Sequence, residues 1–228
     1  MKKLVSEYLR ADDNVSAIQQ SLAKRDARIA RGILGLRGLR IVKTDEWECL
    51  ISFALATYAN IPRISRMIDT LARRYGQRIS KDSYTFPTLE RMKRVSLEDL
   101  SRCGLGYRAR YIQAICQQLT LDDLEELKRL PYDELRDELL ELPGVGDKVA
   151  DCVALFGFGK LESFPIDVWM GRALRRLYGK EGSYRKLAGF ARERFGEYAG
   201  YAQEYLYYNE RAHASSGSCL FSEERRNR

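Results

Sequence analysis

Apolar residues recur at helical spacing along almost the whole chain, and this periodicity restricts the fold more than any other feature. Ile112, Ile115 and Leu119 fall at positions i, i+3 and i+7, which places them on one face of a helix. Residues 46–57 are apolar on nearly every side, which predicts a central buried helix. Sustained alternation of apolar and polar residues is missing. The sequence therefore predicts an all-α fold with little or no sheet.

Glycine and proline steps divide these helices and keep the connections short. The clearest steps lie at Gly104-Leu105-Gly106, Pro143-Gly144, Gly157-Phe158-Gly159 and Pro165. We expect two helical subdomains with an active-site cleft between them. One is a helical barrel of residues 57–165, and the other joins residues 1–56 to residues 166–228.

The chain is basic, with a formal net charge of +7 and a pI near 9.1. A basic balance is expected of proteins that bind polyanions, because each phosphate contact made by Lys or Arg releases counterions. Many basic proteins bind nothing anionic, however. The basic stretch at residues 24–40 also fits a solvated helix face. The charge is thus compatible with a nucleic-acid partner without requiring one.

The cysteines are scattered and odd in number, which argues against a disulfide framework and favours a reducing compartment. They are Cys49, Cys103, Cys116, Cys152 and Cys219. No pair has C-x2-C spacing and His213 is the single histidine, so a protein-ligated transition metal is not expected. The chain has no membrane-length apolar stretch and no secretory signal. We expect an intracellular protein, in the cytoplasm or nucleoid or in a nucleus, without a membrane partner.

The segment with the most chemical content is the turn LPGVG at residues 142–146, which precedes a helix opening at Asp147. Gly144 and Gly146 permit a tight hairpin and a close approach of the backbone to a partner. The N–H groups of the hairpin and of the next helix N-terminus can bind a phosphate. The pattern predicts a helix-hairpin-helix near residues 132–158, which grips a DNA backbone without reading its sequence. An ordinary helical corner is the alternative interpretation.

Lys148 lies in the first turn of the second hairpin helix, and Asp167 follows Pro165 at the start of a predicted helix over residues 168–178. Lys148 also fits a simple phosphate contact, and Asp167 also fits an N-cap. A neutral amine can attack the sugar C1′, displace a base and form a Schiff base. A carboxylate stabilises the positive charge that develops on the sugar as the base leaves. Together the two residues predict a base-excising enzyme.

Residues 139–174 resemble the core of the helix-hairpin-helix DNA glycosylases, and the run LPGVGDKVADC resembles their 8-oxoguanine branch. The resemblance extends over about residues 38–212 and includes the runs CGLGYRARYIQAI and FGEYAGYAQEYLYYNERA. It implies that Lys148 is the nucleophile and Asp167 the catalytic carboxylate of a bifunctional glycosylase. Such an enzyme excises 8-oxoguanine from duplex DNA and then cleaves the abasic site by β-elimination.

The resemblance also assigns residues to a base flipped out of the duplex. Cys152, one turn after Lys148, and Tyr207 match the residues that sandwich the base. Gln203, one turn before Tyr207, matches the residue that reads the Watson–Crick edge of the base. A lone cysteine on an amphipathic helix is also a common core residue, and a glutamine beside aromatic residues is commonly a surface residue.

On the opposite strand, the resemblance implies residues that fill the vacated stack and contact the orphaned cytosine. They are Tyr58, Asn60, Arg63, Tyr107 and Arg108. The alternatives are a solvated Arg63 and a core position for Tyr107. Tyr58 stands where eukaryotic-type relatives carry asparagine, and Trp169 where they carry histidine. The chain begins roughly where their N-terminal β-containing domain ends, so their contact to the N7 hydrogen of the oxidised base has no evident equivalent.

No organic cofactor is expected. The resemblance admits a monovalent or calcium ion on the backbone carbonyls of Leu140, Leu142 and Val145. The expected partner is double-stranded DNA containing an oxidised base, bound by a monomer.

Two other functions stay open. An endonuclease III-like glycosylase for oxidised pyrimidines shares the lysine–aspartate pair, but commonly carries a four-cysteine cluster that is missing here. A non-catalytic hairpin module that only holds DNA gives no reason for Asp167, Cys152 and Gln203 to occur together.

Overall fold

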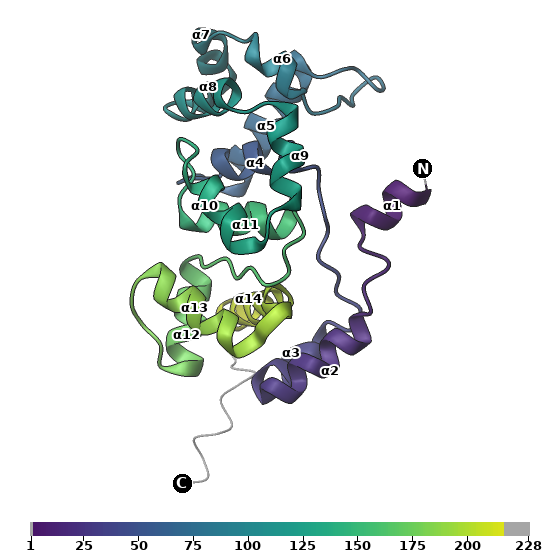
Figure 1. Cartoon of the computed structure of the whole chain (residues 1–228), viewed down its shortest axis with the longest axis vertical. Coiled ribbons are helices and arrows are strands. Elements are labelled where there is room, and N and C mark those ends of the chain that lie inside the picture. The colour runs from purple at the N-terminus through teal and green to yellow at the C-terminus, as the bar shows by residue number, and fades with distance from the viewer. Residues whose placement is uncertain (1, 217–228) are drawn as a thin grey trace. The chain divides into compact units, whose positions relative to one another are not determined.

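The computed structural model describes residues 2–216, and the side chains of residues 2–212 (Figure 1). Within this part of the chain every regular element is a helix, apart from an isolated antiparallel bridge between Arg78 and Tyr84. The predicted all-α fold is confirmed, as the helical spacing of the apolar residues required. None of the described helices is long and apolar enough to cross a membrane. The side chains of His213 and Cys219 lie outside the described residues.

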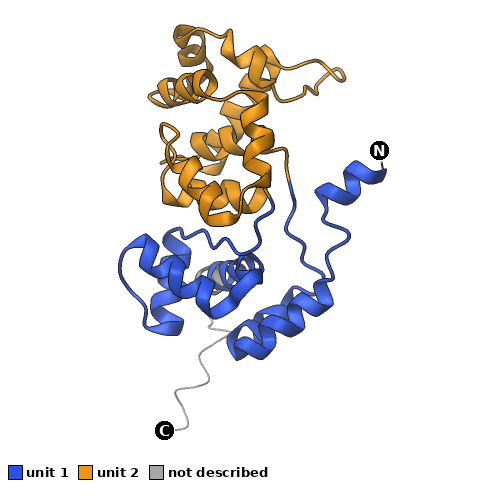
Figure 2. Cartoon of the chain, in the orientation of Figure 1, with its two compact units in different colours: residues 1–43, 159–228 blue, residues 44–158 orange. Residues whose placement is uncertain are grey.

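The chain divides into two compact units, one of residues 1–43 and 159–228 (unit 1) and one of residues 44–158 (unit 2) (Figure 2). Helix α4 (Glu46–Leu55) belongs to unit 2 because it packs against α8 (Arg108–Gln118) and α11 (Asp147–Phe156) of that unit. The boundaries predicted from the sequence place α4 with the other subdomain instead.

Unit 2 is built around α4, whose buried residues contact helices on several sides. The burial predicted for residues 46–57 is confirmed, and the helix ends at Leu55. The other helices of the unit are α5 (Ile61–Tyr75), α6 (Leu89–Lys93), α7 (Leu97–Leu100), η1 (Ser101–Leu105), α8 (Arg108–Gln118), α9 (Leu121–Arg129), α10 (Tyr132–Leu140) and α11 (Asp147–Phe156). Their buried faces form one hydrophobic core.

Unit 1 combines N-terminal helices with C-terminal ones. They are α1 (Lys2–Tyr8), α2 (Val15–Arg25), α3 (Ala27–Gly35), α12 (Val168–Tyr178), α13 (Tyr184–Phe195), η2 (Gly196–Tyr198) and α14 (Ala199–Ser216). Helix α14 packs against both α3 and α12. Gly32 allows the close approach of α3, since a Cβ atom there would lie 2.3 Å from Nδ2 of Asn209. The helix predicted over residues 168–178 is confirmed as α12.

Candidate active site

Residues 141–146 connect α10 to α11 in a tight turn, in which the N–H of Val145 donates to the carbonyl of Leu142 at 3.0 Å. Gly144 has φ +80°, and a Cβ atom there would lie 2.6 Å from the Tyr111 ring, so both the backbone and the packing require glycine. Gly146 has an extended backbone, with no atom within 4 Å of a Cβ position. The turn therefore does not need glycine at position 146, but the open space leaves room for a partner.

A buried network of charges, which the sequence analysis missed, joins the two hairpin helices. Arg136 of α10 forms ion pairs with Asp147 and Asp151 of α11, the latter at 3.0 Å. Tyr132 also donates to the fully buried Asp151, at 2.5 Å. Burial alone would lower the pKa of Arg136, but the hydrogen bond to Asp147 and the charge of Asp151 outweigh it, and the pKa is raised. The network fixes α11 on either side of Lys148.

Lys148 lies in the first turn of α11 and is half-buried. Its Nζ is 5.1 Å from the centroid of the Phe53 ring, which stacks on Phe156 with centroids 5.7 Å apart. The face of an aromatic ring attracts a cationic side chain. The amine is thus held over an aromatic surface that restricts its position.

Cys152 lies one turn after Lys148 on α11 and is buried. Its neighbour across the contact between α4 and α11 is Cys49. Burial, with smaller contributions that include Cys152, raises the pKa of Cys49 to about 12, so the Cys49 thiol stays protonated. No disulfide joins the four cysteines of the described residues. Cys152 is buried, which fits the alternative interpretation of Cys152 as a core residue.

The residues assigned to the opposite strand gather around the turn between α4 and α5. Tyr58 is 95% exposed and has φ +50°. Asn60 caps α5 by accepting the backbone N–H of Arg63 at 3.0 Å, and the Arg63 side chain is exposed. Tyr107 donates its hydroxyl to the Thr57 carbonyl at 3.2 Å. The turn between α4 and α5 and the start of α8 therefore lie side by side.

Tyr107 is half-exposed, so the alternative of a core aromatic residue does not hold. Arg108 differs, because it is only 1% exposed and its Nε donates to the Thr57 carbonyl at 3.0 Å. The guanidinium therefore holds the backbone next to Tyr58. Contact between Arg108 and an outside partner would require that hydrogen bond to be exchanged.

Tyr111, which the sequence analysis did not single out, links this turn to the hairpin. Its ring lies 6.0 Å from the Tyr107 ring and packs on Gly144. The sequence did hold a signal for it, because Tyr111 lies in the run CGLGYRARYIQAI one turn after Tyr107, and the two residues therefore share a helix face. We call the set Tyr58, Asn60, Arg63, Tyr107, Tyr111 and Gly144 the unit 2 contact surface.

In unit 1, Asp167 is the N-cap of α12, and its Oδ1 accepts the backbone N–H of Met170 at 2.9 Å. The predicted capping role is confirmed. The N–H of Ile166 donates to the Tyr184 hydroxyl at 3.2 Å and fixes the segment before the cap. The hydrogen bond from the Met170 N–H holds the Asp167 carboxylate in place.

Gln203 and Tyr207 lie one turn apart on α14. Gln203 is 7% exposed, and its Oε1 is buried without a hydrogen-bond partner. An unsatisfied buried acceptor costs about 1–3 kcal/mol, and such groups are rare in folded proteins. A ligand that donates a hydrogen bond to Gln203 would remove this cost.

A pocket of about 430 Å³ opens beside these residues within unit 1, and we call it the unit 1 pocket. Its lining is Leu36, Leu39, Glu204, Tyr207, Tyr208, Arg211 and Ala212. Burial and, to a smaller extent, the nearby charge of Asp167 raise the pKa of Glu204 to about 7. Glu204 therefore keeps its proton in part of the molecules near neutral pH, and it lies near Asp167, which caps α12.

Ionisation of Glu204 should destabilise the folded protein. Its folded pKa of about 7 lies above the ordinary 4.5, so its contribution to stability is complete below the ordinary pKa and is lost as the pH rises through about 7. Between about pH 5 and pH 8, the unfolding midpoint of the wild type should fall further than that of Glu204→Gln. We expect a difference of several degrees, because the shift corresponds to at most about 3 kcal/mol and each 1 kcal/mol moves the midpoint by roughly 2–4 °C in a chain of this size. Parallel pH profiles in thermal unfolding would contradict this.

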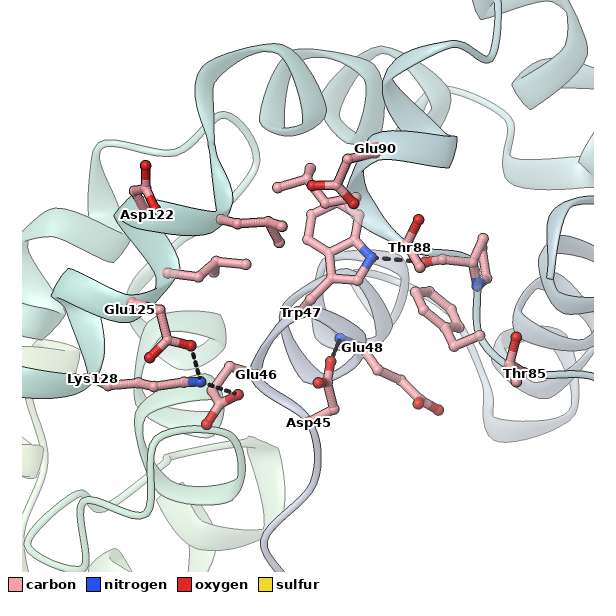
Figure 3. A pocket seen from close by; sticks show the side chains of 15 residues that line it. Asp45, Glu46, Trp47, Glu48, Thr85, Thr88, Glu90, Asp122, Glu125 and Lys128 are labelled. Carbon is pink, nitrogen blue, oxygen red and sulfur yellow. Dashed lines mark hydrogen bonds and ion pairs between the residues drawn. The ribbon is translucent and has the colours of Figure 1, made fainter. Parts of the chain in front are cut away.

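Unit 2 has a separate pocket of about 630 Å³, which Figure 3 shows. Its carboxylates are Asp45, Glu46, Glu48, Glu90, Asp122 and Glu125. Lys128 pairs with Glu46 at 3.3 Å and with Glu125 at 2.6 Å. Burial and the charge of Asp45 raise the pKa of Glu48. A surface with this excess of carboxylates repels polyanions, so it is distinct from the unit 2 contact surface.

Comparison with known proteins places this geometry in a family. Residues 51–196 match the HhH-GPD superfamily of base excision DNA repair proteins, and the chain belongs to that superfamily. Residues 1–50 match the 8-oxoguanine DNA glycosylase N-terminal domain. The predicted resemblance to the 8-oxoguanine glycosylases is thus confirmed, and it extends to the N-terminus. The helices of this N-terminal segment include α1 to α3, and no strand is among its described residues.

Individual relatives agree with this assignment. The 8-oxoguanine glycosylase/lyase of Clostridium acetobutylicum, solved with double-stranded DNA containing cytosine opposite 8-oxoG, superposes with a TM-score of 0.86 at 32% identity; the match covers 93% of this chain and 75% of that one. A probable N-glycosylase/DNA lyase of Methanothermobacter thermautotrophicus is 37% identical over 75% of this chain and 63% of its own length. N-glycosylase/DNA lyase OGG1 of Arabidopsis thaliana is 34% identical over 88% of this chain and 60% of its own length. The chain thus spans about three fifths of these two curated relatives.

Proposed function

We propose that this chain is a bifunctional DNA glycosylase that excises 8-oxoguanine from duplex DNA and cleaves the abasic site. The observation that carries the proposal is the position of Lys148, which presents an amine at the start of the second hairpin helix. Asp167, held as an N-cap, supplies the second group that the reaction needs. The similarity to 8-oxoguanine glycosylase/lyases supports this choice of substrate.

In the proposed reaction, Nζ of Lys148 forms a bond to the sugar C1′ while the glycosidic bond breaks and its electron pair leaves with the base. The Asp167 carboxylate stabilises the positive charge that develops at C1′. Opening of the sugar ring gives the protonated imine. Removal of a C2′ proton then expels the 3′ phosphate, which is the β-elimination step.

The flipped base would lie between Cys152 and Tyr207, with its Watson–Crick edge toward Gln203. The buried Oε1 of Gln203 without a partner supports this, because guanine bases present N–H donors on that edge. Stacking on Tyr207 suits any purine, so Gln203 would provide the discrimination. Cys152 is only 4% exposed, so contact with the base would need a small movement of the side chains around it.

The unit 2 contact surface would hold the duplex. The hairpin N–H groups and the open space at Gly146 suit a phosphate, and this contact does not depend on sequence. Tyr58 would fill the gap that the flipped base leaves, with Asn60, Arg63 and Tyr107 around it. Arg108 would support Tyr58 through the Thr57 carbonyl and reach the orphaned cytosine after exchange of that bond.

A monovalent or calcium ion fits the hairpin carbonyls in donor chemistry, because these ions take hard oxygen ligands. Leu142 already accepts the N–H of Val145, which leaves one lone pair on its oxygen. The carbonyls of Leu140 and Val145 would complete the set, and the ion would fix the hairpin for phosphate contact. No organic cofactor enters the proposed reaction, and we further propose an intracellular monomer.

The test is a panel of duplexes that carry 8-oxoguanine, an oxidised pyrimidine or no lesion. Incubation with borohydride should give a covalent protein–DNA adduct with the 8-oxoguanine duplex, and single-turnover excision should be at least about 100-fold faster there than with the oxidised pyrimidine. Faster excision of the pyrimidine would favour the endonuclease III-like alternative. Binding without excision or adduct on every duplex would favour a non-catalytic hairpin module.

A further inference from the structure

Glu204 has no role in the reaction as described, although within unit 1 it lies next to residues that carry it. It follows Gln203 directly on α14 and precedes Tyr207 by one turn. Its side chain is half-buried, lines the unit 1 pocket with Tyr207 and interacts with Asp167. The proposed function requires Lys148 and Asp167 to act on one sugar. A group beside both Asp167 and Tyr207 would then lie beside that sugar and its base.

The departing base takes the electron pair of the glycosidic bond, and a proton delivered to it lowers the barrier. Asp167 is unsuited to this task, because it caps α12 and must stay ionised to stabilise the sugar. Two neighbouring carboxyl groups divide such roles when their environments differ, one remaining charged and the other keeping its proton. Glu204 has the environment of the second kind, with leucine and tyrosine side chains on the walls of its pocket.

We propose that the carboxyl group of Glu204 donates the proton to the base as it leaves. The glycosidic bond breaks, its electron pair goes to the base, and the O–H proton of Glu204 is transferred to the base. Attack by the neutral amine leaves Nζ of Lys148 as a secondary ammonium. This ammonium then returns a proton to the Glu204 carboxylate. One proton therefore passes from the lysine to the base, and no further reactant is consumed.

The surroundings of Glu204 let its carboxyl group both keep a proton and release it near neutral pH. Burial and the charge of Asp167 give it a pKa of about 7, so both protonation states are populated near neutral pH. The other titratable or charged groups that line its pocket are Tyr207, Tyr208 and Arg211, all on α14. The segment after α3 contributes Leu36 and Leu39 to the pocket. The excision rate should therefore fall as the pH rises through about 7.

The experiment compares two reactions of the full chain under single-turnover conditions. The first is release of 8-oxoguanine from a duplex, which needs a proton on the leaving base. The second is cleavage of a preformed abasic site, which has no base to protonate but still uses Lys148 and Asp167. Glu204→Gln should slow the first reaction by about 10²–10⁴-fold and change the second by less than about two-fold. It should also abolish the decline of excision above about pH 7.

Glu193→Gln is the matched control, since Glu193 is an exposed glutamate on α13 of the same unit. It should leave both reactions unchanged. If Glu204→Gln slows both reactions equally, or neither, the proton-donor role is overturned while the proposed function stands. A wild type that releases no 8-oxoguanine overturns the proposed function, and the role of Glu204 with it. If the glutamine variant does not fold, Glu204→Asp serves instead, because it keeps the acid but moves it by one methylene group. Excision should then slow while cleavage of the abasic site does not. Equal slowing of both reactions overturns the role of Glu204.

Discussion

Replacing Lys148 with glutamine should abolish the covalent adduct that borohydride traps on an 8-oxoguanine duplex. The adduct needs a primary amine at the sugar C1′, and glutamine offers an amide whose nitrogen is not nucleophilic. The loss should exceed about 10³-fold, because nothing else in the proposed reaction forms the bond to C1′. Folding should persist, because the half-buried side chain loses mainly its contact with the Phe53 ring, worth about 0.5–1 kcal/mol.

Adduct formation is measured by gel electrophoresis, and duplex binding by fluorescence anisotropy. Lys93→Gln is the control, since Lys93 is an exposed lysine on α6 of the same unit. It removes the same charge and should trap normally. The Lys148 variant should retain duplex binding within a few-fold. A Lys148→Gln protein that traps like the wild type would show that another amine is the nucleophile.

Replacing Asp167 with asparagine should separate its structural role from its chemical one. Asparagine caps helices about as well as aspartate, so the hydrogen bond to the Met170 N–H should survive. The lost charge costs about 0.3–1 kcal/mol at the helix N-terminus, which lowers the unfolding midpoint by at most roughly 4 °C. Single-turnover excision should fall by about 10²–10³-fold, because nothing replaces the negative charge beside C1′.

A second N-cap provides the matched control for this variant. Asp45 caps α4 in the same way, accepting the N–H of Glu48 at 2.9 Å. Asp45→Asn should therefore have a similar small effect on thermal unfolding and none on excision. Near-normal excision by Asp167→Asn would leave Asp167 as a structural cap only.

Local sequence signals predicted the elements that carry the candidate site. Pro165 and Asp167 defined the start of α12, and the glycine-rich turn defined the hairpin, because caps and breakers act on the backbone next to them. The helical pairing of Lys148 with Cys152 likewise needed only the period of one helix.

What the sequence did not predict depends on contacts between distant elements. Arg136 pairs with Asp151 of α11, and Arg108 donates to the Thr57 carbonyl. The sequence around each arginine gives no sign of these partners. Helical periodicity predicts the face on which a residue lies and not its partner, so neither contact was predicted, although Arg108 itself was assigned to the opposite strand. The same holds for Glu204, whose raised pKa comes from burial and from Asp167, a residue far away in the sequence.

Tyr58 has a consequence for how this protein could change under selection. A left-handed backbone costs a residue with a side chain about 1–2 kcal/mol, and the almost fully exposed ring gains little from packing. The free protein is therefore less stable than its fold permits, and a glycine or asparagine would suit this backbone better. Under the proposed function, the same ring is needed in the duplex. Selection for thermal stability and selection for repair would thus act in opposite directions on this one side chain.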